Sequence, residues 1–209
     1  STPIKSSAAS DVYKRQVDAS AFPVLNMLNT RYFIFPLQGG KTMPIQNPYT
    51  LGNAWFVDKV QYVNNANEEI EALHKVMPAK VAVVDKKFAE QVKPVAVSDS
   101  LRFVKLVAYE PNDLKYEVSS EKGGVVVFSE IYYPGWQAYI DGVEAPHGRA
   151  DYILRAMNVP AGKHTVEFKF DPKSLHTTET IAFVALGLLA MAVLLLLVLQ
   201  GKALWGKKG

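Results

Sequence analysis

The sequence contains no cysteine, so thiol catalysis, thiolate metal sites and a disulfide framework are excluded. Histidine is scarce as well. The chain has four histidines: His74, His147, His164 and His176. They are far apart in the sequence, and none has a partner at metal-ligand spacing, so we expect no metal site. The chain also lacks a P-loop, a GxSxG elbow, an HExxH motif and a glycine-rich dinucleotide fingerprint. We therefore expect no cofactor.

A basic patch is missing too. The net charge is +3 over 209 residues, and the lysines are scattered singly along the chain. Proteins that bind nucleic acid cluster their cations, because phosphate contacts supply most of the affinity. We therefore expect no nucleic-acid partner.

One long stretch, in contrast, has no charge at all. It runs from Ile181 to Leu199 and reads "IAFVALGLLAMAVLLLLVL". At about 1.5 Å per residue it forms a helix of roughly 28 Å, close to the thickness of the hydrocarbon layer of a bilayer. The alternative is a buried core helix of a soluble protein, but such helices are seldom so long and so uniformly apolar. The sequence predicts a transmembrane helix at residues 176–200 and the lipid bilayer as a partner.

The lysines on the two sides of this run indicate its orientation. Lys202, Lys207 and Lys208 follow the run, whereas Lys169 and Lys173 precede it. Because cytoplasmic flanks carry the excess of cations, this count favours a cytoplasmic tail at residues 201–209. The soluble part of the chain is then expected to be extracytoplasmic.

The first part of the chain divides into two segments. Residues 1–16, "STPIKSSAASDVYKRQ", have no apolar period, and they are either a disordered linker or a non-native leader. For residues 17–98 the sequence predicts a small α/β unit. Strands are expected at about 31–35 and within 53–63, and the turn formers between them predict a loop.

A helix is predicted to follow in that unit. Asn67 is a suitable N-cap, and Ile70, Leu73 and Met77 form an apolar face that ends before Pro78. The run "VAVV" at 81–84 predicts a short buried strand, followed by a second small helix capped by Asp85. Strand, helix and strand in this order indicate a βαβ crossover.

The pattern then changes to short alternating strands. In "LKYEVSS" the residues Leu114, Tyr116 and Val118 share one face, and "HTVEFKF" alternates in the same way. Turn residues separate these strands at intervals of about ten residues, which is typical of an antiparallel sandwich. This pattern therefore predicts a β-sandwich at residues 99–175. The fold class is α+β, with a small α/β unit, an antiparallel β-sandwich and one C-terminal transmembrane helix.

The aromatic stretch "YYPGWQAYIDG", residues 132–142, joins two of these strands and has two interpretations. Trp136 shares a face with Ala138 and Ile140, so it is expected in the core of a hairpin. Alternatively, the flat faces and hydroxyl groups of the tyrosines suit a sugar.

A second candidate for ligand binding is the loop "EAPHGRADY", residues 144–152, which contains a histidine, an arginine, an aspartate and a tyrosine. It is interpreted either as a ligand contact or as a solvated hairpin loop. The carboxylates in this region are no more numerous than on an ordinary surface, so no catalytic residue is assigned. The two stretches together give the candidate glycan-binding residues: Tyr132, Tyr133, Tyr139, His147, Arg149, Asp151 and Tyr152.

Several separated motifs, taken in their order along the chain, also resemble those of a known protein family. They are "LNMLNTRYFI", "LGNAWFV", "YYPGWQAYIDG" and "RADYILRAMNVPAGKHTVEFKFDP", followed by the membrane helix. From about Phe22 to its end, the chain resembles the C-terminal end of the YfhO family of bacterial multi-spanning membrane proteins. The resemblance implies an upstream membrane domain in the bacterial cytoplasmic membrane, similar to the GT-C class of lipid-linked-sugar glycosyltransferases.

Three functions follow from these observations. The resemblance implies support for sugar transfer from a polyprenyl-phosphate donor to an envelope glycan or polymer, with the catalytic acidic residue outside this chain. The other two are a membrane-anchored glycan-binding module without chemistry and a purely structural domain. Whether the parent is an enzyme stays open, and this chain alone is not expected to be catalytic.

Overall fold

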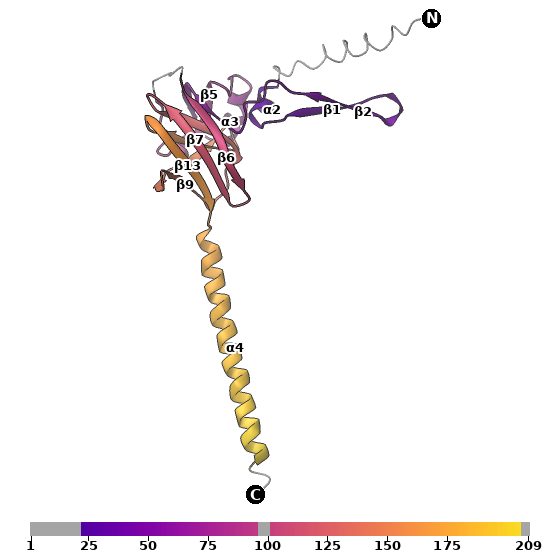
Figure 1. Ribbon diagram of the computed structural model, residues 1–209, viewed down its shortest axis with the longest axis vertical. Helices are drawn as coiled ribbons and strands as arrows, with labels where there is room; N and C mark the ends of the chain where they lie inside the picture. Colours follow the sequence, from indigo (N-terminus) through magenta and orange to yellow (C-terminus); the bar gives the residue numbers. More distant parts are fainter. Residues whose placement is uncertain (1–21, 96–100, 206–209) are drawn as a thin grey trace, which may run out of the picture. The chain divides into compact units, whose positions relative to one another are not determined.

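The computed structural model describes residues 22–95 and 101–205 (Figure 1). The chain divides into two compact units, one up to Lys169 and one from Phe170 onward. The first unit contains the β-sheets, and the second contains one long helix.

A four-stranded antiparallel sheet occupies the middle of the first unit, in the order β11-β12-β8-β3. Its strands are β3 (Ala54–Val57), β8 (Gly124–Ile131), β11 (Gly148–Ala150) and β12 (Leu154–Val159). Strand β8 is buried on both faces from Val125 to Phe128. This explains its uninterrupted apolar sequence, because a strand covered on both sides needs no polar face.

A five-stranded sheet covers one face of the four-stranded sheet, in the order β10-β9-β13-β7-β6. Its strands are β6 (Phe103–Glu110), β7 (Asp113–Ser120), β9 (Trp136–Ile140), β10 (Val143–Ala145) and β13 (Gly162–Phe170). The predicted inward face is confirmed, since Leu114, Tyr116 and Val118 are all buried. Between the two sheets, the Phe128 ring lies 4.8 Å from that of Phe168 and 4.9 Å from that of Tyr116. These contacts confirm the sandwich.

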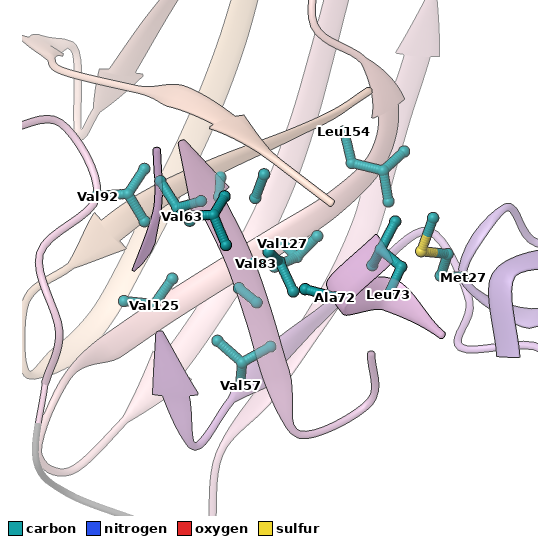
Figure 2. Close-up of a cluster of buried hydrophobic side chains, with 14 residues drawn as sticks. Met27, Val57, Val63, Ala72, Leu73, Val83, Val92, Val125, Val127 and Leu154 are labelled. Carbon is teal, nitrogen blue, oxygen red and sulfur yellow. The ribbon is translucent and has the colours of Figure 1, made fainter. Parts of the chain in front are cut away.

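A βαβ element covers the opposite face. It consists of β4 (Lys59–Val63), α3 (Ala66–Leu73) and β5 (Val81–Asp85), and β4 pairs with β5 in parallel, as predicted. Figure 2 shows Val83 and Leu73 of this element in one cluster with Val125 and Val127 of β8. The four-stranded sheet is therefore the middle of three layers.

The predicted N-cap of α3 is wrong, and of its predicted apolar face only Leu73, which is 3% exposed, is buried. The N-cap is Asn65, whose side chain accepts from the backbone N–H of Glu68 at 3.0 Å, and not Asn67. Ile70 and Met77 are 42% and 61% exposed, and the helix ends at Leu73. The buried face also contains a charged residue, Glu69, which has an ion-pair partner in the sandwich.

The N-terminal part adds an element that was predicted as a loop. After α2 (Pro23–Met27), β1 (Tyr32–Pro36) and β2 (Thr42–Gln46) form a two-stranded antiparallel hairpin, with the 3-10 turn η2 (Gln38–Gly40) at its tip. The strand beginning near residue 31 was expected, but β2 was not. At the base of the hairpin, the Asn47 side-chain amide donates to Asn26 Oδ1 at 2.8 Å.

One strand from the N-terminal side of the domain boundary expected near residue 98 is part of the sandwich. Strand β3 precedes that point in sequence but pairs with β8 in the sandwich. The small helix expected after Asp85 is the short 3-10 helix η3 (Lys86–Phe88), and the Asp85 carboxylate accepts from the backbone N–H of Lys87 as predicted. The domain limits at 17–98 and 99–175 stay a prediction, and residues 1–16 lie outside the described residues.

The second unit contains α4 (Lys173–Trp205), a helix of 33 residues and thus about 50 Å long. Its segment Ser174–Leu199 is long and apolar enough to cross a membrane. The apolar side chains from Ile181 to Leu199 are exposed around the whole helix, as lipid contact requires.

Candidate functional site

The aromatic residue Phe88 on η3 connects several of the predicted site residues. The Tyr132 ring lies 5.2 Å from that of Phe88 and 5.7 Å from that of His147. On the other side, the Arg149 guanidinium lies 5.7 Å from the Phe88 ring and 5.6 Å from the Tyr152 ring. Four of the seven candidates therefore lie in one group of edge-on and tilted ring contacts and cation–π contacts, which we call the Phe88 cluster.

His147 is a neutral member of this cluster. Burial, together with the nearby Arg155 guanidinium, lowers the pKa of His147 to about 4. Its imidazole ring packs edge-on against Phe168, with ring centroids 5.5 Å apart. At neutral pH the ring carries no charge, so it contributes an aromatic surface and not a cation.

Arg149 and Asp151 face the interior, where they join the βαβ element to the sandwich. Arg149 Nη2 lies 2.6 Å from Glu69 Oε2 and 3.8 Å from Asp85 Oδ2. The other Glu69 oxygen accepts from the backbone N–H of Tyr152 at 2.9 Å. Burial is the main cause that raises the pKa of Glu69, and the Arg149 contact opposes the shift. Because the Glu69 side chain is fully buried, these partners replace the hydrogen bonds that water would make to its carboxylate.

Asp151 forms a second connection at the same junction. Its Oδ1 accepts from the Val83 N–H at 2.8 Å, and its own N–H donates to the Val83 carbonyl at 2.7 Å. Burial raises the pKa of Asp151 to about 8, and the Glu69 charge adds to the effect. The carboxyl group is therefore mainly protonated at neutral pH. Asp151 and Tyr152 have φ angles of 50° and 73°, which form the sharp reversal between β11 and β12.

Tyr139 lies apart from the Phe88 cluster, on the outer face of the five-stranded sheet. Its hydroxyl group donates to Gln137 Oε1 at 2.6 Å, and Lys169 Nζ lies 5.5 Å from its ring centroid. Glu167 on β13 contacts Lys169 at 3.3 Å and Lys115 at 2.8 Å. The hydrogen bond from Lys115 is the main cause that lowers the pKa of Glu167. We call these five residues the Tyr139 platform.

Trp136 faces inward, as the sequence predicted, and packs against the sandwich core together with Ile140. Its ring centroid lies 4.0 Å from the guanidinium carbon of Arg155, which is only 2% exposed. Arg155 Nε donates to the Ile131 carbonyl at 3.0 Å. Tyr133, in contrast, is 61% exposed in the loop before Trp136. The aromatic stretch thus supplies a core residue, Trp136, and one exposed tyrosine, Tyr133, whereas Tyr132 and Tyr139 are half-buried.

The structure therefore does not gather the seven predicted residues into one site. Tyr132, His147, Arg149 and Tyr152 lie in the Phe88 cluster, Asp151 lies in the adjoining junction, and Tyr139 and Tyr133 lie elsewhere on the surface. Sequence reasoning missed Phe88, Glu69 and Arg155. Their partners are distant in the chain, with 80 positions between Glu69 and Arg149, so no local motif marks them.

The comparison with known families concerns the sandwich and the start of α4. Residues 89–182 match the family described as bacterial membrane protein YfhO. This segment is similar to the YfhO family. It contains β6 to β13, and hence the whole Tyr139 platform and the Trp136–Arg155 stack. No curated protein and no solved structure matches the chain.

The YfhO segment and the apolar helix together show that the chain is a membrane protein. The resemblance noted in the sequence began at about Phe22, so it also included the βαβ element and the hairpin. The family match begins later, at residue 89. One residue of the Phe88 cluster, Phe88 itself, therefore precedes the matched segment.

Proposed function

We propose that this chain supplies the C-terminal extracytoplasmic domain and last membrane helix of a YfhO-like integral membrane protein. In this proposal the sandwich holds an envelope glycan or polymer while a sugar is transferred to it from a polyprenyl-phosphate donor. The catalytic residues belong to a part of the parent outside this chain, and the C-terminus is cytoplasmic. The YfhO match and the three-to-two excess of lysines after the apolar run support this arrangement.

The Tyr139 platform is the observation that carries the glycan-binding part of the proposal. It combines one aromatic ring with an amide, a carboxylate and two ammonium groups on one face of the five-stranded sheet. The apolar C–H face of a pyranose stacks on an aromatic ring, while its hydroxyl groups exchange hydrogen bonds with fixed donors and acceptors. Glu167 is held between Lys115 and Lys169, so its carboxylate is oriented before a ligand arrives.

The Phe88 cluster is a weaker candidate for this role. The Tyr132 ring is half-buried between Phe88 and His147, so little of its face is left for a sugar. Arg149 already contacts Glu69 and two aromatic rings. These contacts support a junction between two parts of the fold.

The test is glycan binding by the full chain in lipid nanodiscs. Soluble bacterial envelope oligosaccharides are titrated into the wild type and into Tyr139→Ala, and calorimetry measures the affinity. Loss of the stacking surface should weaken binding about tenfold, equivalent to about 1.4 kcal/mol. The unfolding midpoint should stay nearly unchanged, because Tyr139 lies outside the core clusters.

Two further variants make the test specific. Tyr49→Ala removes an exposed tyrosine far from the platform in sequence and should bind as the wild type does. Tyr132→Ala probes the Phe88 cluster. If Tyr132→Ala loses affinity and Tyr139→Ala does not, the glycan contact lies at Phe88 and the assignment to Tyr139 is wrong. If no oligosaccharide binds the wild type, the glycan-binding proposal fails.

The second candidate is a membrane-anchored module that binds glycan or stabilises the parent without any associated transfer. The observation that favours it is that the charged residues bind other parts of the protein. Glu69, Arg149 and Asp151 all have partners at the junction between the βαβ element and the sandwich. The protein sequence encoded upstream distinguishes this candidate from the transferase.

A further inference from the structure

The β1–β2 hairpin exposes apolar side chains to an unusual extent. Its register places Phe33 opposite Ile45 and Phe35 opposite Met43, so these four share one half-buried face. The other face exposes 70% of Ile34 and, at the neighbouring outward position, 58% of Tyr32. A hairpin in water normally presents one polar face. Here the outer face combines Tyr32 and Ile34 with two prolines, and its polar side chains are those of Thr42 and Gln46.

Its place in the fold offers little cover for these residues. The hairpin is a two-stranded sheet of its own (Figure 1), and among the residues that the structure describes no third strand pairs with it. Such a sheet is only marginally stable in water without a further surface to pack on. The Phe22 ring, 6.1 Å from Phe33, reaches only one face near the base.

The charge of this region indicates what covers the hairpin. The sequence has no acidic residue between Asp18 and Asp58. At the average content of the chain, 20 acidic residues in 209, these 39 positions would hold about four. The cations of the interval, Arg31 and Lys41, stand at the base and near the tip of the hairpin, and both are exposed. Aromatic side chains with cations and no anions match the interface of a bilayer that contains anionic lipids.

The connection to a membrane helix makes this partner the favoured one. The apolar helix confines the first unit near a bilayer, so the membrane surface is present at high effective concentration. We propose that the β1–β2 hairpin is a second membrane contact, which lays its aromatic and aliphatic side chains into the headgroup region of an anionic bilayer. The contact holds the first unit at the lipid surface, and it does not depend on the glycan proposal.

The lack of cysteine in the chain allows a direct test. Thr42, exposed on β2 near the tip, is replaced by cysteine (Thr42→Cys) and labelled with an environment-sensitive fluorophore. The full chain is reconstituted into phosphatidylcholine vesicles with or without phosphatidylglycerol, and lipids with brominated acyl chains serve as quenchers. Glu144→Cys, at an exposed position on β10, gives the matched control site.

We expect blue-shifted emission and quenching by brominated lipid at position 42, stronger with phosphatidylglycerol, and neither effect at position 144. In the Thr42→Cys background, Lys41→Gln should lower the ratio of docked to free hairpin about fivefold in anionic vesicles, the typical effect of one cation near such a surface. Ile34→Ser should lower it in both lipid compositions.

Two outcomes would overturn the proposal. One is solvent-like emission at position 42 in both compositions. The other is a blue shift that brominated lipid does not quench and that grows with protein density in the vesicle, which would identify a second copy of the chain as the partner.

Discussion

The Asp151→Asn substitution should change how stability depends on pH. Asp151 is fully buried at the junction, and its pKa is raised to about 8 from an ordinary value of 3.8. Asparagine keeps the acceptor for the Val83 N–H but does not titrate, and it tolerates the left-handed backbone at φ 50°. The variant therefore removes the titration while it leaves the turn in place.

The sign and size of the effect follow from proton linkage. Between about pH 4 and pH 8 the folded wild type holds a proton on Asp151 that the unfolded chain has lost, so the free energy of unfolding falls as the pH rises. The slope is about 1.4 kcal/mol per pH unit, or about 2.7 kcal/mol between pH 5 and pH 7. Within the part of the chain that the structure describes, Asp151 Oδ2 has no hydrogen-bond partner. The amide N–H groups of the asparagine therefore lower the free energy of unfolding by an amount that does not depend on pH.

The assay is denaturant unfolding of the full chain in detergent micelles, followed by tryptophan fluorescence at several pH values. Asp151→Asn should gain about 2.7 kcal/mol relative to the wild type as the pH rises from 5 to 7. Asp113→Asn, at an exposed aspartate in the β6–β7 hairpin, is the control and should run parallel to the wild type. Parallel profiles for Asp151→Asn and the wild type would refute the reasoning, because they would mean that Asp151 is ionised in the folded state.

Two other substitutions test the packing and the helix start by the same unfolding assay. Trp136→Ala should destabilise the sandwich by about 3 kcal/mol, since it exposes core surface and removes the ring stacked on buried Arg155. A near-neutral result would make Trp136 a surface ligand platform instead. Asn65→Ala should cost about 1 kcal/mol by removing the cap of α3, whereas Asn67→Ala should stay within about 0.5 kcal/mol. Equal effects of the two would contradict the assignment of the cap.

Local patterns predicted much of the fold. The alternation around Tyr116 and the charge-free run after Ile181 each follow from one element and its surroundings, and both predictions hold. The βαβ crossover was predictable for the same reason, because its three parts are consecutive and short. Strand β2 was not, since Pro44 within it and the glycines of η2 are turn formers in any local window.

The site was less predictable, because its residues meet through long-range contacts. From the sequence alone, Glu69 would be expected on the exposed face of a helix. Its burial is explained by Arg149 and the Tyr152 N–H, which lie 80 and 83 positions away. The same pairing places Glu69 on the buried face of α3 together with the predicted core residue Leu73. The loop around His147 was interpreted as a ligand contact or as a solvated hairpin loop. Sequence reasoning did not identify the interior partners of two of its polar residues, Glu69 for Arg149 and Val83 for Asp151.

The account depends most on the claim that this YfhO segment is part of a larger membrane protein. Sequencing the genomic DNA upstream of the codon for Val17 tests that claim directly. The account predicts an open reading frame that continues into many hydrophobic spans, with an acidic residue in an extracytoplasmic loop near the first of them. A start codon or a signal peptide just upstream would contradict it, and the chain would then be a single-span glycan-binding or structural protein.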